Sequence, residues 1–224
     1  MTKLLKALLI TALLVSSAAQ AVVVRGTGTA ALVGRDLTDP ENNGLPDANV
    51  NYNATFRSSL ENGFGGGEFA YNVFDNRVGG GNDKWCCDQN ANLWVEANFG
   101  TQRYLLTKFT ATSSNDTPGR DSDIWNIFGS NDGVNYTSIF AYNKNGTSPW
   151  TRRNQVNLYS AGTDFAVQTK GYSIFRYHSS STVSSNHALN ELEFFGTKIP
   201  EPGMLSLMAL ALAGLGLSLR KKQQ

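Results

Sequence analysis

The middle of the chain consists of short segments in which apolar and polar residues alternate, separated by turn residues. In Leu93–Phe99 every second side chain is apolar, which is the two-residue period of a half-buried strand. Further strands are expected at Tyr104–Thr112, Ile124–Gly129, Thr137–Tyr142, Gln155–Tyr159, Tyr172–His178 and Leu189–Phe195. Asn131-Asp132-Gly133 and a second Asn/Gly cluster at 143–146 suit tight connections. Roughly eight strands with no amphipathic helix between them predict an all-β fold, an antiparallel β-sandwich.

The N-terminal end has the features of an export signal. Lys3 and Lys6 precede the apolar stretch Ala7–Val15, and Ala19-Gln20-Ala21 closes it. A charged start, a short apolar region and a small-residue site describe a secretory signal peptide, which predicts cleavage after Ala21. The part of the chain that follows is therefore expected to work outside the cytoplasm.

The C-terminal end carries a second signal. Pro200-Glu201-Pro202 is followed by the apolar run Gly203–Leu219 and then by Arg220-Lys221-Lys222. Seventeen apolar residues are at the short end of what spans a bilayer, so an anchoring helix with its basic end in the cytoplasm is one interpretation. The same order also resembles the PEP-CTERM sorting signal, and this second interpretation is favoured. The resemblance implies an exosortase-type processing enzyme as a partner, and a transient or permanent membrane anchor through residues 198–224. It places the protein in the cell envelope or the exopolysaccharide matrix of a Gram-negative bacterium.

The remaining 178 residues, Val22–Ile199, amount to one domain, long enough to bury a core of its own. They contain 14 Lys and Arg against 17 Asp and Glu, so no basic surface for nucleic acid is expected. Turn residues are frequent before residue 51, so 22–51 is expected to be an irregular lead-in. The sandwich is expected over 52–197.

Four segments in order resemble the discoidin, or coagulation-factor type C, family of galactose-binding-like jelly rolls. They are Ser58–Asn62 with Glu68–Asn76; Lys84-Trp85 with Leu93–Gly100; Gly119–Thr137; and Phe175-Arg176-Tyr177 with Leu189–Gly196. The third segment is the most specific, although Ser122 and Tyr136 replace the Pro and Trp of the family pattern. The resemblance implies a jelly-roll sandwich over about residues 53–197. Trp85, Trp94 and Trp125 are expected in or at the edge of its core.

Many discoidin-like domains carry a calcium ion that joins the loop after the first strand to the last strand. Carried over by position, Asp75 and Glu191 would supply carboxylates, and Asp83 stands where the family has Thr. The loop between, Asn76–Asn82, departs from the family spacing because it contains three consecutive glycines. The resemblance therefore implies a structural calcium site with a changed loop.

The two cysteines, Cys86 and Cys87, are adjacent and cannot join distant strands. They could close on each other in a small ring, pair between chains, or remain as buried thiols. A local ring or burial is favoured, and a redox role stays open.

Sugar-binding residues are sought in three loops: Gly79–Ala91, Ser113–Asp121 and His178–His187. Their polar candidates are Arg120, His178, Asn186 and His187, while Arg120 and Asp121 are also expected to form an ion pair. The favoured hypothesis is a non-catalytic protein that binds a polysaccharide or glycan. A structural matrix protein without a specific sugar site is the alternative.

Catalysis is the third and least favoured hypothesis. The sequence has no H-E-x-x-H motif, no phosphate-binding glycine loop and no G-x-S-x-G turn. An envelope glycosidase or lyase would need a pair of carboxylates for acid and base work. Those available are Glu68, Asp75, Glu96, Glu191 and Glu193.

Overall fold

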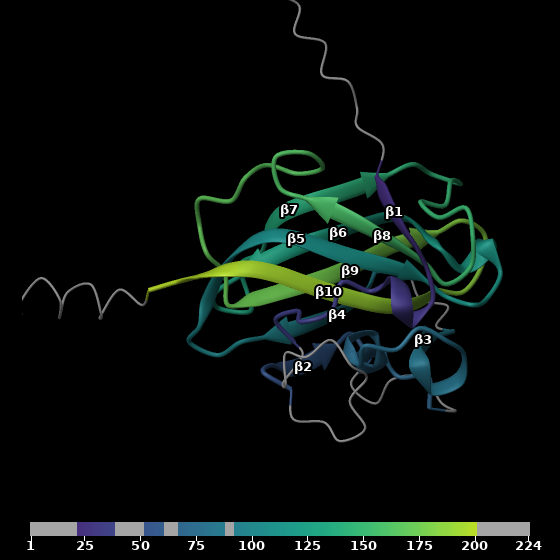
Figure 1. The fold of residues 1–224 in the computed structure, drawn as a ribbon, viewed down its shortest axis with the longest axis horizontal. Coiled ribbons are helices and arrows are strands. Elements are labelled where there is room, and N and C mark those ends of the chain that lie inside the picture. Colours follow the sequence, from purple (N-terminus) through teal and green to yellow (C-terminus); the bar gives the residue numbers. More distant parts are fainter. Residues whose placement is uncertain (1–21, 39–51, 61–66, 88–91, 201–224) are drawn as a thin grey trace, which may run out of the picture.

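Two five-stranded antiparallel sheets pack face to face in the computed structural model, which describes residues 22–38, 52–60, 67–87 and 92–200 (Figure 1). The first sheet has the order β1 (Val23–Thr27), β8 (Gln155–Ser160), β5 (Arg103–Ser113), β10 (Ala188–Ile199), β3 (Trp85–Cys86). The second has the order β2 (Thr55–Ser58), β4 (Leu93–Asn98), β9 (Ile174–Thr182), β6 (Ser122–Ser130), β7 (Thr137–Asn143). The described residues contain no α-helix. Their short 3₁₀ turns are η1 (Thr29–Ala31), η2 (Ala70–Phe74), η3 (Gly81–Asp83) and η4 (Pro118–Arg120). The predicted all-β sandwich is confirmed.

The core between the sheets is rich in aromatic rings. Trp125 of β6 is fully buried. Its ring centre lies 6.1 Å from that of Phe109 in the first sheet and 5.5 Å from that of Tyr177 in the second. Trp85 of β3 is also fully buried. Each large side chain removed from water in this way stabilises the fold by about 1.5–3 kcal/mol. The two tryptophans therefore occupy the core positions predicted for them.

Trp94 differs, because its place in β4 points the ring to the outer face of the second sheet. The guanidinium carbon of Arg176 lies 3.8 Å from the centre of the Trp94 ring and 3.9 Å from that of Tyr136. One face of the tryptophan is thus covered by a cation held between two rings. The prediction that Trp94 lies in or at the edge of the core is therefore wrong, because the ring lies outside the core cluster and packs against Arg176 instead.

The expected irregular lead-in is wrong at its start. Val23–Thr27 forms β1, which pairs with β8 and carries a bulge at Gly26. Further on, the Leu37 amide donates to the carbonyl of Phe194, and Asp36 is buried beside β10. The valines at 22–24, directly after the predicted cleavage site, favour a strand. The many turn residues that follow them led to the prediction of an irregular segment. Residues 39–51 of the lead-in lie outside the described part of the chain.

One other strand is displaced from its prediction. β9 spans Ile174–Thr182 rather than Tyr172–His178, because Tyr172 leaves the second sheet and bridges to Tyr104 of the first. The signal peptide at 1–21 and the run Gly203–Leu219 lie outside the described residues, as do Glu201 and Pro202. Pro200 is exposed directly after β10. Within the described residues, no helix has the length and apolar character needed to cross a bilayer.

Candidate functional site

Parts of the three loops singled out above meet at one end of the sandwich. The carbonyl of Gly119 accepts hydrogen bonds from the amides of Ser184 (2.9 Å) and Ser185 (3.0 Å), and the carbonyl of Asp121 accepts from Val183 (2.9 Å). These bonds join the loop before β6 to the connection between β9 and β10. Two of the three predicted loops are therefore one continuous surface.

Lys84 attaches the remaining loop to this surface. Its ammonium nitrogen lies 2.6 Å from Asp116 Oδ2, 2.9 Å from Asn115 Oδ1 and 3.3 Å from Glu68 Oε1. The lysine side chain is 6% exposed, so its charge depends on these partners rather than on water. Residues 88–91 of the same loop lie outside the described part of the chain. In the sequence, Lys84 stands out only as part of the Lys84-Trp85 segment of the family resemblance and Asp116 only as a member of the loop Ser113–Asp121, and nothing there predicts that they pair.

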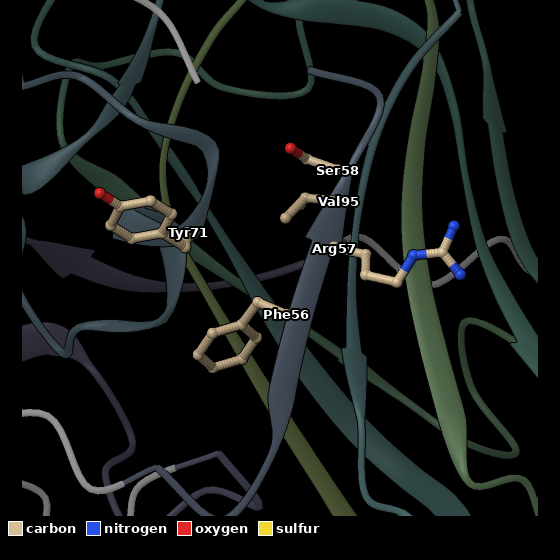
Figure 2. Close-up of a pocket in the computed structure, with 5 residues that line it drawn as sticks. All are labelled: Phe56, Arg57, Ser58, Tyr71 and Val95. Atoms are coloured by element: carbon tan, nitrogen blue, oxygen red, sulfur yellow. The ribbon is translucent and has the colours of Figure 1, made fainter. Parts of the chain in front are cut away.

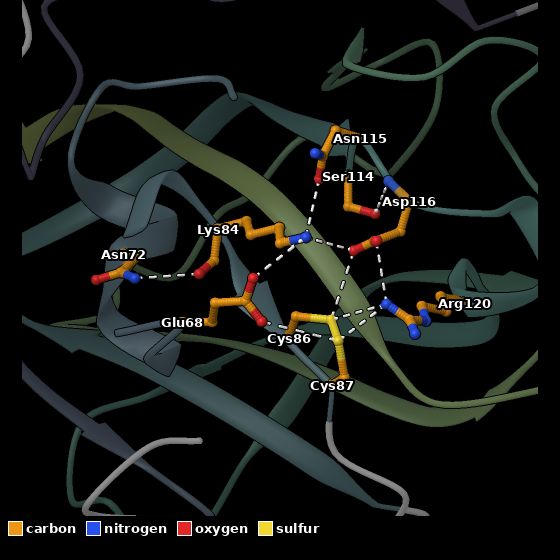
Figure 3. The surroundings of a disulfide bond; sticks show 9 residues. All are labelled: Glu68, Asn72, Lys84, Cys86, Cys87, Ser114, Asn115, Asp116 and Arg120. Carbon is orange, nitrogen blue, oxygen red and sulfur yellow. Dashed lines mark hydrogen bonds and ion pairs between the residues drawn. A yellow bond between two sulfur atoms is a disulfide. The ribbon is translucent and has the colours of Figure 1, made fainter. Parts of the chain in front are cut away.

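Cys86 and Cys87 form a disulfide with each other across a cis peptide bond, which is the local ring anticipated from their adjacency. Figure 3 shows the side chains around it. Arg120 Nη1 lies 3.3 Å from Cys86 Sγ, 3.0 Å from Cys87 Sγ and 3.0 Å from Asp116 Oδ1. We call Glu68, Lys84, Asp116, Arg120 and the disulfide the ring cluster.

The predicted ion pair between Arg120 and Asp121 is wrong. Asp121 is fully buried and accepts two hydrogen bonds from Arg153, at 2.7 and 2.6 Å, and one from Ser148. Arg120 ends the 3₁₀ turn η4 while Asp121 follows it in an extended conformation directly before β6, so the two side chains have different partners. Arg120 therefore faces the ring cluster and keeps 28% of its side chain exposed.

The other three predicted sugar contacts differ in their surroundings. Asn186 is half-buried in the connection between β9 and β10. His178 is half-buried on the outer face of β9, where burial and the charge of Arg176 lower its pKa. His187 is 1% exposed and packs edge-on against Trp85, with ring centres 4.5 Å apart, and burial lowers its pKa to about 3. In this arrangement His187 is a core residue and presents no surface to a sugar.

The residues predicted for calcium lie around the start of the loop after η2. Asp75 and Glu191 are hydrogen-bonded to each other, and Glu191 Oε2 is buried without a further partner among the described residues. Burial, with repulsion from Asp83, raises the pKa of Asp75 to about 7, and burial with repulsion from Asp75 raises that of Glu191 well above its usual value. A buried carboxylate with an unmet oxygen beside a half-buried one is a donor pair that fits a hard cation. We call Asp75, Asp83 and Glu191 the carboxylate cluster.

Two hollows lie away from the loop end. A notch of about 30 Å³ beside β2 is lined by Phe56, Arg57, Ser58, Tyr71 and Val95 (Figure 2). It holds little more than a water molecule. The Arg57 side chain points away from it. A more open hollow of about 280 Å³ lies where β4 ends, lined by Tyr52, Asn53, Ala54, Thr55, Asn98, Phe99 and Gly100.

The carboxylates that a glycosidase would need are mostly enclosed. Glu96 and Glu193 are 1% and 0% exposed. Arg176 binds the first (2.7 Å), and the amides of Val33 and Gly34 with the Thr110 hydroxyl bind the second. Glu191 is also buried, and Glu68 is paired with Lys84. Acid and base catalysis needs a pair that reaches substrate, so this geometry does not favour hydrolysis.

Comparison with known proteins identifies one sequence motif and one fold. Residues 198–222 match the PEP-CTERM protein-sorting motif. No curated protein matches the sequence. Among solved structures, the family 62 carbohydrate-binding module of Clostridium thermocellum Xyl5A is similar with a TM-score of 0.51 and 18% identity, over 65% of this chain and 96% of that chain.

Two further structures are similar at lower scores. The module CpGH89CBM32-5 from Clostridium perfringens, in complex with GalNAc-beta-1,3-galactose, has a TM-score of 0.47 and 16% identity, over 64% of this chain and 96% of its own. The family 32 module of NanJ from C. perfringens, in complex with galactose, has a TM-score of 0.46 and 14% identity, over 63% of this chain and 93% of its own. The described chain thus has the jelly-roll fold of carbohydrate-binding modules, and the sorting motif follows that fold in the sequence.

Proposed function

We propose that this chain, with the fold of a carbohydrate-binding module and a PEP-CTERM protein-sorting motif, is an exported, non-catalytic glycan-binding protein of the cell envelope or its exopolysaccharide matrix. A fold alone does not determine a function, so the proposal rests on the loop end of the sandwich. Its main support is that three separate loops are joined there into one polar surface.

The chemistry of that surface suits sugar hydroxyls. Arg120 presents a partly exposed guanidinium next to the carboxylate of Asp116, and Asn115 is exposed beside them. A donor and an acceptor held side by side can bind two neighbouring hydroxyl groups at once. Asn186, across the bonded loops, would add an amide. His178 lies on the adjoining strand face and would contact only a longer glycan.

A structural calcium ion is the second part of the proposal. Asp75 and Glu191 would bind it, with Asp83 from η3 as a third carboxylate. The ion would join the loop after η2 to β10 and fix the loop's shape, without taking part in chemistry. The buried, unmet oxygen of Glu191 supports this assignment.

The tail is proposed to direct export and sorting. An exosortase-type enzyme would recognise Pro200-Glu201-Pro202 and release the domain, and before that step the run Gly203–Leu219 would hold it in the membrane. Released protein would then meet the polysaccharide outside the cell.

The proposal is tested by binding of the full chain to a glycan array and to the host's own exopolysaccharide, with calcium and with chelator. Arg120→Gln is the test variant, and Arg57→Gln on β2, 57% exposed and outside the three loops, is the matched control. We expect saturable binding that Arg120→Gln weakens by about tenfold and Arg57→Gln leaves unchanged, since a charged hydrogen bond contributes about 1.5–3 kcal/mol.

Absence of saturable binding by the folded chain would overturn the proposal and favour a structural matrix protein. Turnover of a polymer would favour a glycosidase or lyase instead. Equal loss in both arginine variants would place the site elsewhere.

A further inference from the structure

The ring cluster has balanced charge only while the disulfide is closed. Glu68 and Asp116 carry two negative charges, and Lys84 and Arg120 carry two positive ones. Lys84 pairs with both carboxylates, and Arg120 pairs with Asp116. Opening the disulfide adds two thiols to the same place. Their ionised forms would add two negative charges without a partner, so the open ring requires either two protons or one divalent cation.

The surrounding oxygens are placed to complete a site for such a cation. The ligand atoms of Glu68, Cys86 and Cys87 all lie within 4.8 Å of one another. Glu68 Oε2 is 3.9 Å from Cys87 Sγ, and Asp116 Oδ2 is 3.5 Å from Cys86 Sγ. In Figure 3 the two carboxylates reach the sulfurs from different sides.

The separation between Asp116 and Cys86 equals the edge of a tetrahedron around zinc, and that between Glu68 and Cys87 is a few tenths of an ångström longer. Bonds of about 2.3 Å to sulfur and about 2.0 Å to oxygen separate a sulfur from an oxygen by about 3.5 Å and two sulfurs by about 3.8 Å. On opening, the sulfurs therefore need to separate from a bonded distance of about 2.0 Å to about 3.8 Å, which rotation about the two Cα–Cβ bonds supplies.

We propose that the reduced ring cluster is a zinc site, in which Cys86, Cys87, Glu68 and Asp116 bind one Zn²⁺ that the closed disulfide excludes. Two thiolates with two carboxylates are a four-ligand set that a borderline-soft divalent ion accepts. Lys84 and Arg120 stay as outer partners, donating to the free lone pairs of the carboxylate and sulfur ligands.

Opening requires an extracytoplasmic dithiol as reductant. One thiolate of that dithiol attacks Cys87 Sγ, which is the more accessible sulfur because Cys87 is half-buried and Cys86 is fully buried. The sulfur–sulfur bond breaks and Cys86 leaves as a thiolate next to Arg120. The second thiol of the reductant then displaces Cys87 and becomes half of a new disulfide. The two cysteine thiolates take up the two protons that the dithiol gives up, and they release these protons to water as Zn²⁺ binds.

The test uses the full chain in mild detergent, either oxidised or reduced by a dithiol and freed of it without oxygen. Thiols are counted, Zn²⁺ content is measured after dialysis, and Cd²⁺ is added to follow the ultraviolet charge-transfer band of cadmium thiolates. We expect one Zn²⁺ per reduced chain and none per oxidised chain. Glu68→Gln and Asp116→Asn should each weaken zinc by about tenfold or more, comparable with loss of an outer partner or greater.

The double variant Cys86→Ser with Cys87→Ser should bind no zinc in either state. Asp132→Asn, which changes a carboxylate in the exposed turn after β6, is the matched control and should bind as the unaltered chain does. Three results would overturn the proposal: equal zinc binding by oxidised and reduced chains, unchanged affinity in both carboxylate variants, or a disulfide that the dithiol cannot open in the folded protein. The readouts do not involve sugar binding, so this outcome is separate from that of the proposed function.

Discussion

The ring cluster and the carboxylate cluster both bury acidic side chains, but they differ in how the charge is balanced. In the ring cluster each carboxylate lies within 3.3 Å of a Lys or Arg nitrogen. In the carboxylate cluster the buried groups face each other, and the nearest ion pair is Arg77 with Asp83 at 3.9 Å. Burial and mutual repulsion raise the pKa values of Asp75 and Glu191, whereas lysine and arginine balance the carboxylates of the ring cluster. The two regions thus differ in whether the protein itself supplies the cation, and the calcium ion proposed above would supply one to the carboxylate cluster.

The largest expected effect comes from removing the charge of Lys84, which pairs with both carboxylates of the ring cluster. Lys84→Met should lower the free energy of unfolding by about 3–5 kcal/mol, because it leaves Glu68 and Asp116 enclosed without their shared partner. Urea unfolding measures this difference. Adding Glu68→Gln and Asp116→Asn to the same chain should restore part of the loss. A Lys84→Met chain as stable as the unaltered one would show that water, rather than lysine, balances these carboxylates.

Calcium should act on the other region alone. At a hundredfold excess over its dissociation constant, a bound ion raises the free energy of unfolding by about 2.7 kcal/mol. Glu191→Gln removes a buried ligand, so the rise in melting temperature with calcium should disappear in that variant. Without calcium the variant should unfold at a higher temperature than the unaltered chain, since repulsion with Asp75 is relieved.

Glu68→Gln is the matched control for calcium, because it changes a carboxylate of the ring cluster. It should keep the full calcium shift. A shift lost in Glu68→Gln and kept in Glu191→Gln would reverse the assignment of the two regions.

Acid should have opposite effects on the stability contributed by two buried groups, His187 and Asp36. Burial lowers the pKa of His187 to about 3, from 6.5 in the unfolded chain. Its neutral form therefore contributes stability that is complete above pH 6.5 and is lost as the pH falls towards 3, at about 1.4 kcal/mol per pH unit. Burial raises the pKa of Asp36 to about 7, so that group acts in the opposite direction.

The histidine effect is isolated by comparing the unaltered chain with His187→Phe. Unfolding by urea at several pH values between 4 and 6.5 gives the two slopes, and the contribution of Asp36 cancels in their difference. The unaltered chain should lose stability with acid faster than the variant. Parallel profiles would mean that His187 takes up its proton in the folded protein and is not enclosed as the structure has it.

Features that depend on residues close in the sequence could be predicted, whereas contacts between distant segments could not. Alternation within Leu93–Phe99 is local, so that strand was predictable, whereas the burial of Trp85 was implied by the family resemblance of Lys84-Trp85. Lys84 meets Asp116 across 32 positions, and Arg153 meets Asp121 across the same number. Such pairs depend on which loops the sandwich brings together, and no spacing rule encodes them. The adjacency of the cysteines favoured a local ring or simple burial, of which the structure has the ring, and it did not indicate the four charges around it.

The smallest expected effect concerns Glu96, another buried carboxylate, which two arginines approach unequally. Arg176 lies 2.7 Å from Glu96, is 16% exposed and stacks between Trp94 and Tyr136. Arg57 lies 3.9 Å away and is 57% exposed. Arg57→Gln should therefore change the free energy of unfolding by less than about 0.5 kcal/mol, because an exposed pair of this kind contributes little. Arg176→Gln should cost several times more. Equal costs in urea unfolding would mean that the charge at Glu96 is balanced by the field of both arginines. The distance from a carboxylate to the nearest arginine or lysine would then not be enough to decide whether its charge is balanced.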